Sequence, residues 1–280
     1  MNPPPEKEQR IRVGITHGDV NGIGYEIIIK TLQDQRLMET YTMIVYGSSK
    51  VASYHRKTLN INDFNFNLVK KADMAHPRRP NIINIVEDEV KLDLGKSTAI
   101  AGELSLLSLE MAMSDLLANN IDLIVTAPIN KQNIQSPGFT FPGHTEYLAQ
   151  KAGVSDYLML MVSNTVRIGV ITGHIPLDKV TSSLTEDLIL RKIDIMNRSL
   201  IRDFGILKPR IAVLAVNPHA GEGSVVLRQM PLPNLFSRKI KGGHVPGRKS
   251  ESALRVSEPR RTKYGSFARL PATASWRDRN

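Results

Sequence analysis

Apolar runs rich in branched residues alternate with helical patterns through residues 11–224, and this alternation constrains the fold more than any other feature. The predicted strands are short and apolar on successive residues, as strands covered on both faces are; they span residues 12–16, 41–46, 81–86, 121–126, 167–172 and 210–216. The predicted helices span residues 22–33, 48–59, 102–119, 145–152 and 183–204, and the last opens with the capping-box pattern Ser-Leu-Thr-Glu. Alternating strands and helices predict an α/β fold with a mostly parallel, doubly wound sheet.

The alternation stops near residue 225. Residues 225–280 contain five prolines and no sustained apolar periodicity, so they cannot offset their ordering entropy by burial. They hold thirteen Lys and Arg against three Asp and Glu, which accounts for the whole formal net charge of +10. We therefore expect three regions: a flexible N-terminus at 1–10, an α/β region at 11–224, and a basic, disordered tail at 225–280.

Composition excludes several classes of protein. The chain has no cysteine, so any metal must be held by His, Asp or Glu. No apolar run approaches the roughly 18–20 residues of a membrane span, and the N-terminus lacks an apolar signal core. We expect a cytoplasmic protein with no membrane partner. The basic tail lacks helical periodicity and paired aromatic residues, so we do not expect a nucleic-acid partner.

In an open α/β sheet, ligands bind beyond the carboxyl ends of the strands. Four histidines stand in loops of this kind, His17, His144, His174 and His219. A single histidine there more often steadies a loop than binds a ligand, whereas several at one sheet edge favour a site. Imidazole ligands without thiolates suit Zn, Co, Ni or Mn acting as a Lewis acid.

Two further loops carry polar residues. Asp19 lies in Gly18–Glu26, a glycine-rich stretch that opens a helix, so its N–H groups could face an anion. It matches neither the dinucleotide nor the phosphate-loop motif, and a plain tight turn explains it equally well. Lys131 ends the stretch after another strand, where it either meets a phosphate or is solvated.

Five segments together resemble the 4-hydroxythreonine-4-phosphate dehydrogenase family of pyridoxal 5′-phosphate biosynthesis. They are ITHGDVNGIGYEI, VTAPINKQNI, FPGHTEYLA, ITGHIPL and NPHAGEG, in the family's order and spacing over roughly residues 11–223. The resemblance implies a fold like that of isocitrate and isopropylmalate dehydrogenases and a homodimer with its active site at the subunit interface. It also implies a divalent metal (Zn, Mg, Co, Ni or Mn) and NAD or NADP as oxidant.

The resemblance also implies roles for particular residues. His174 and His219 match metal ligands, and His144 with Thr145 match substrate contacts. The implied reaction oxidises 4-phosphooxy-L-threonine to a 3-keto acid, which loses CO2 to give 3-amino-2-oxopropyl phosphate. A paralogous substrate, phosphorylated threonate or erythronate, is the nearest enzymatic alternative.

The family pattern breaks off after NPHAGEG. The family continues with a Tyr-His-Asp-Gln-Gly motif that supplies a third histidine ligand, and this motif is not recognisable here; His244 lies outside any such motif. Replacement by an Arg-, Ser- and Pro-rich sequence is typical of a reading-frame shift near Ser224. The α/β region would then be incomplete at its C-terminal end, and the alternative to an active dehydrogenase is an inactive fragment of one.

Overall fold

The computed structural model describes residues 10–136, 138–214 and 216. They form two compact units, divided after Val154. Three predictions lie outside the described residues: the flexible N-terminus except residue 10, the tail at 225–280, and His219.

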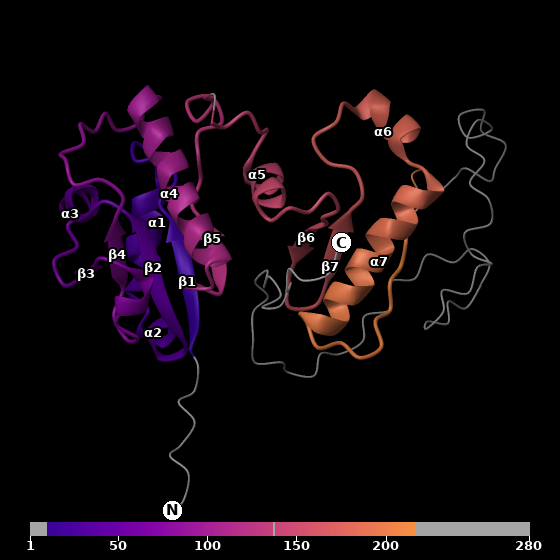
Figure 1. Ribbon diagram of the computed structural model, residues 1–280, viewed down its shortest axis with the longest axis horizontal. Coiled ribbons are helices and arrows are strands. Elements are labelled where there is room, and N and C mark those ends of the chain that lie inside the picture. Colours follow the sequence, from indigo (N-terminus) through magenta and orange to yellow (C-terminus); the bar gives the residue numbers. More distant parts are fainter. Residues whose placement is uncertain (1–9, 137, 215, 217–280) are drawn as a thin grey trace, which may run out of the picture. The chain divides into compact units, whose positions relative to one another are not determined.

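The first unit contains a five-stranded parallel sheet, which confirms the predicted α/β class (Figure 1). Its strands are β1 (Ile11–Thr16), β2 (Tyr41–Gly47), β3 (Asn67–Val69), β4 (Asn81–Asn84) and β5 (Leu123–Thr126), in the order β3-β4-β2-β1-β5. Strands β2, β4 and β3 lie on one side of β1, in that order outward, and the chain then crosses over to place β5 on the other side of β1. The strand order therefore reverses between β1 and β5, which is where doubly wound folds bind their ligands.

Helices cover both faces of this sheet: α1 (Gly24–Leu32), α2 (Gln35–Thr40), α3 (Ser49–Thr58) and α4 (Ala99–Leu117), with α5 (His144–Lys151) following β5 and a 3₁₀ turn at Ala72–Met74. Capping side chains set the first residues of α2, α3 and α4. Thr98 accepts a hydrogen bond from the N–H of Ala101 at 3.4 Å, so α4 begins at residue 99 and not at the predicted 102. None of the described helices is both long and apolar enough to cross a lipid bilayer.

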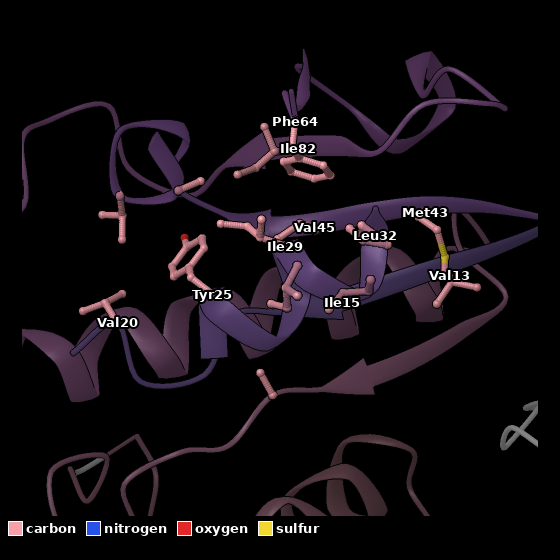
Figure 2. Packing of buried hydrophobic residues seen from close by; sticks show 14 of the residues in the cluster. Val13, Ile15, Val20, Tyr25, Ile29, Leu32, Met43, Val45, Phe64 and Ile82 are labelled. Carbon is pink, nitrogen blue, oxygen red and sulfur yellow. The ribbon is translucent and has the colours of Figure 1, made fainter. Parts of the chain in front are cut away.

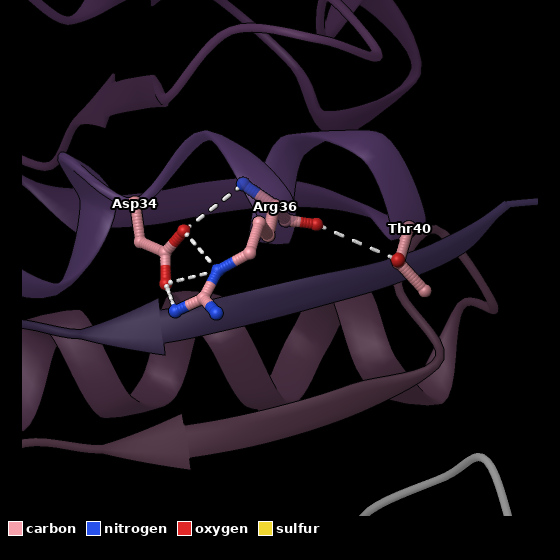
Figure 3. A network of polar contacts seen from close by, with 3 residues as sticks. All are labelled: Asp34, Arg36 and Thr40. Atoms are coloured by element: carbon pink, nitrogen blue, oxygen red, sulfur yellow. Dashed lines mark hydrogen bonds and ion pairs between the residues drawn. The ribbon is translucent and has the colours of Figure 1, made fainter.

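The short helix α2, which the sequence pattern did not predict, is capped by an exposed acidic side chain (Figure 3). Asp34 accepts from the N–H of Arg36 at 3.1 Å and pairs with its guanidinium at 2.6 Å. The pairing with Arg36 lowers the pKa of Asp34. Exposed ion pairs add little stability, so the cap mainly decides where the helix starts.

Alternate residues of the central strands face opposite layers of helix. Val13 and Val45 pack with Ile29 of α1 in one cluster (Figure 2). Ile44 packs with Ala112 of α4 in another. Since fully burying each such aliphatic side chain stabilises the fold by roughly 1.5–3 kcal/mol, the two layers of helix together hold the sheet and the loops that leave it.

The second unit consists of an antiparallel hairpin and two helices: β6 (Met159–Val162), β7 (Arg167–Val170), α6 (Leu177–Ser183) and α7 (Glu186–Arg202). The predicted start of the last helix is wrong by three residues. Thr185, and not Ser183, caps it by accepting from the N–H of Leu188 at 3.2 Å. Ser183 instead ends α6.

The strand predicted at 210–216 is also wrong for the residues described there, which form no strand. Val213, Leu214 and Val216 are 41%, 88% and 53% exposed. A branched apolar run becomes a strand only when a neighbouring strand accepts its hydrogen bonds and other layers cover its faces. Among the described residues β7 pairs with β6 and with no part of this run.

Gly102 of α4 offers a test of the packing. A Cβ atom there would lie 1.9 Å from the carbonyl oxygen of Asn133. Alanine normally stabilises a helix relative to glycine by roughly 0.5–1 kcal/mol, but here we expect Gly102→Ala to destabilise by about 1–3 kcal/mol. Urea unfolding measures the difference. Ser114→Ala on the exposed face of α4 is the control, and a stabilised Gly102→Ala protein would contradict the close approach.

Candidate functional site at the switch point

The loops that follow β1 and β5 are bonded directly to each other. The N–H of Ala127 donates to the carbonyl of Thr16 at 3.1 Å, and the N–H of Asp19 donates to the carbonyl of Pro128 at 2.9 Å. Gly18 between them has φ of +69°, and a Cβ there would lie 2.2 Å from the oxygen of Pro128. Only glycine tolerates both conditions, so at Gly18 the two loops meet through backbone alone.

The loop after β1 is a tight turn. Besides the bond from Asp19, the N–H of Asn21 donates to the carboxylate of Asp19 at 2.9 Å, and the N–H of Gly22 donates to the carbonyl of Asp19 at 3.0 Å. A bound anion would find these three N–H groups occupied and a carboxylate beside them. The tight turn is therefore the better of the two sequence interpretations, and this loop does not fit the phosphates of a dinucleotide.

His17 lies in the core at the end of β1, with 1% of its surface exposed. Its ring stacks on Tyr25 at 5.3 Å between centroids, and Tyr25 stacks on His55 at 5.2 Å. Neither ring nitrogen of His17 has a hydrogen-bond partner of good geometry among the described residues. Burial lowers the pKa of His17 to about 4, partly opposed by the backbone of Gly18 and Leu104. The imidazole is thus neutral near pH 7.

Two buried serines of α4 fix this loop from behind, and the sequence reasoning missed both. Ser108 Oγ donates to the carbonyl of Tyr46 at 2.6 Å and accepts from the N–H of His17 at 3.3 Å. Ser105 Oγ donates to the carbonyl of Gly18 at 2.7 Å. Serines three residues apart in an otherwise apolar helical pattern were the available signal, because buried hydroxyls need partners.

The first turn of α5 carries two of the predicted residues, His144 and Thr145. His144 is half-buried, and its Nε2 has no hydrogen-bond partner among the described residues. Burial lowers the pKa of His144, and the positive charge of Lys131 lowers it further. Thr145 follows directly, and Gly143 caps the helix without a side chain, so the first N–H groups lack a side-chain acceptor. A cation, a neutral imidazole, a hydroxyl and a helix N-terminus suit a polar, anionic ligand.

The second unit places His174 in the loop after β7. The residue is exposed and has φ of +56°, an uncommon conformation for a residue other than glycine. Its predicted partner His219 lies outside the described residues, and within those described no three His, Cys, Asp or Glu side chains gather as a metal site. The metal pair therefore stays a prediction.

Two hollows flank α3 and involve none of the predicted site residues. A cavity of about 230 Å³ is lined by Lys50, Val51, Tyr54, Glu89, Val90 and Leu92. A smaller one of about 80 Å³ is lined by Ser49, Ala52, Ser53, Arg56, Phe64, Asn65 and Phe66. Neither contains a buried polar atom without a partner, whereas the first turn of α5 does.

A parallel sheet with helices on both faces, whose strand order reverses between β1 and β5, defines a doubly wound α/β protein, a class that includes many dehydrogenases. Within that class the chain belongs to the family described as "Pyridoxal phosphate biosynthetic protein PdxA", whose family model matches residues 39–228.

Relatives of known description agree with this family. A 4-hydroxythreonine-4-phosphate dehydrogenase of Bacteroides thetaiotaomicron is 46% identical over 221 residues, which are 79% of this chain and 60% of that protein. A protein of Oceanobacillus iheyensis, provisionally described as a D-threonate 4-phosphate dehydrogenase, is 31% identical and covers 76% of this chain and 64% of its own length. A 4-hydroxythreonine-4-phosphate dehydrogenase structure from Klebsiella pneumoniae superposes with a TM-score of 0.66 at 32% identity, over 76% of this chain and 65% of that one. The chain thus spans about two thirds or less of these relatives.

Burial of His17 predicts acid sensitivity. Its pKa is lower in the folded protein, about 4, than the ordinary 6.5, so the unfolded state binds more protons between these values and stability falls as pH falls through that window. We expect a loss of roughly 3 kcal/mol from this group. Unfolding free energies from pH 7 to 4 measure it. In the non-titrating variant His17→Gln, the unfolding free energy should fall less steeply with falling pH, by the slope that one bound proton contributes. An unchanged slope would contradict the assignment.

Proposed function

We propose that the first turn of α5, with Lys131, binds the substrate of a metal-dependent oxidation of 4-phosphooxy-L-threonine that uses NAD or NADP, a step in pyridoxal 5′-phosphate biosynthesis. The observation that carries this proposal is a half-buried histidine, His144, in the first turn of a helix without a side-chain cap, whose Nε2 has no partner among the described residues. The positive charge of Lys131 adds to the effect of burial in lowering the pKa of His144. Relatives described as 4-hydroxythreonine-4-phosphate dehydrogenases support this choice of substrate. A homodimer with the active site at its interface belongs to the same proposal.

The chain's own residues would bind and orient the substrate. Lys131 offers a positive charge to the phosphate. His144 is neutral near pH 7, so its Nε2 can share a hydrogen bond with a substrate hydroxyl or carboxylate. The Thr145 hydroxyl and the first N–H groups of α5 supply further donors. Holding a small substrate at several points reduces the entropy that the reaction must lose later.

The metal and the nicotinamide rest on the family resemblance. His174 and His219 would hold a divalent metal (Zn, Mg, Co, Ni or Mn), which would favour loss of the substrate hydroxyl proton. The nicotinamide would accept the hydride. The 3-keto acid product would then lose CO2 to give 3-amino-2-oxopropyl phosphate.

A second candidate substrate is phosphorylated D-threonate. The Oceanobacillus relative favours it, and threonate differs from threonine at the amine and not at the reacting hydroxyl. Comparing the affinity of the chain for the two compounds distinguishes the candidates. Tighter binding of the amino acid is expected under the main proposal.

Substitutions at the site should weaken binding. Lys131→Gln should reduce the affinity for 4-phosphooxy-L-threonine by about tenfold, since a charge-assisted contact is worth about 1.5 kcal/mol. His144→Ala should act in the same direction. Titration calorimetry of the purified chain measures both. Lys57→Gln, an exposed charge on the last turn of α3, is the control and should bind like the parent; equal affinities for all variants would contradict the site.

Turnover tests the frameshift hypothesis separately. The 280-residue chain with a divalent metal, NAD+ or NADP+ and substrate should form no reduced nicotinamide above background, because residues 225–280 carry no recognisable third histidine motif. Robust formation of NADH or NADPH would overturn the hypothesis that these residues are read in the wrong frame.

A further inference from the structure

The loop that carries Lys131 is a compact turn fixed at its far end. The Asn130 side chain accepts from the N–H of Gln132 at 2.9 Å, and the N–H of Ile134 donates to the Asn130 carbonyl at 3.2 Å. Ile134 is 1% exposed and packs in a cluster with Phe139. Lys131 therefore stands near the tip of a turn whose direction depends on how residues 133 and 134 are held.

Asn133 is held between two other elements. Its Nδ2 donates to Asp19 Oδ2 at 3.4 Å. Its carbonyl oxygen lies against α4, where a Cβ on Gly102 would approach within 1.9 Å. The Asn133 side chain thus joins the turn to the β1 loop, while its main chain rests on the helix.

Asp19 is a fixed anchor for this contact. The residue is 9% exposed, its N–H is bonded to Pro128, and its other carboxylate oxygen accepts from the N–H of Asn21 at 2.9 Å. Ser105 holds the carbonyl of the preceding residue, Gly18. A buried carboxylate with these partners has little freedom to move.

We infer that Asn133 is a positioning residue, which through Asp19 holds in place the turn that carries Lys131. The sequence separates Asp19 from Asn133 by more than a hundred positions, and the contact exists because β1 and β5 are neighbours in the sheet. This inference rests on the proposed function only for the role of Lys131 and His144 in binding substrate. The positioning itself is a property of the unliganded chain.

A double-mutant cycle tests the inference. The pKa of His144 is measured by NMR titration in the parent, Lys131→Gln, Asn133→Ala and the double variant, without substrate. In the parent background, Lys131→Gln should shift the pKa of His144 upward, because it removes a neighbouring positive charge. With Asn133→Ala that shift should be lost, since Lys131 is no longer held in place. An equal shift in both backgrounds would overturn the inference.

Control variants separate positioning from general damage. Gln132→Ala changes an exposed neighbour of Asn133 and should leave the Lys131 effect intact. Asn133→Ser, which stays polar but cannot reach Asp19, replaces Asn133→Ala if the latter does not fold, and it should also abolish the effect. The cycle contains no substrate, so its outcome is independent of the substrate-binding titrations. An equal pKa shift in both backgrounds would overturn the positioning inference alone, and unchanged affinities in the titrations would overturn the proposed function alone.

Discussion

The backbone contact between the β1 and β5 loops is the constraint on which the rest of the site depends. Gly18 lies against Pro128 so closely that no side chain fits, and the adjacent N–H of Asp19 completes the junction. In doubly wound folds this crevice usually admits the ligand. Here backbone hydrogen bonds join the two loops directly, so we place the proposed ligand-binding groups beside this junction and not in it.

The junction needs polar support from the layers around it. Ser105 and Ser108 of α4 form hydrogen bonds with backbone groups at the end of the sheet, namely the carbonyls of Gly18 and Tyr46 and the N–H of His17. These bonds avoid the cost of burying polar groups without partners. His17 is the exception, since its buried ring nitrogens have no hydrogen-bond partner of good geometry among the described residues. The stack of His17 on Tyr25 and of Tyr25 on His55 offsets part of that cost, and burial lowers the pKa of His17 so that the ring stays uncharged. Structure near the site is thus stabilised most firmly at neutral pH.

The sequence predicts the sheet better than the site. Branched apolar runs identify β1 and β2 almost to the residue, because strands buried on both faces have no polar alternation to confuse them. The run at 210–216 has the same composition but forms no strand where it is described, since pairing depends on neighbours that composition does not reveal. The effect of the Lys131 charge on the pKa of His144 could not be predicted either, because it depends on the course of the twelve residues between them, among which Asn133 is bonded to Asp19. His174 matches the family at the level of sequence, and the ligand role that the resemblance implies still requires His219.

Amide NMR of the labelled chain during addition of 4-phosphooxy-L-threonine tests the central claim most directly. The account predicts that the largest shifts fall on Lys131 and on residues 143–146 at the start of α5, with smaller ones in the turn at 130–134. Shifts concentrated instead around the cavity lined by Lys50 and Tyr54 of α3, or along residues 18–24, would contradict the placement of the substrate site.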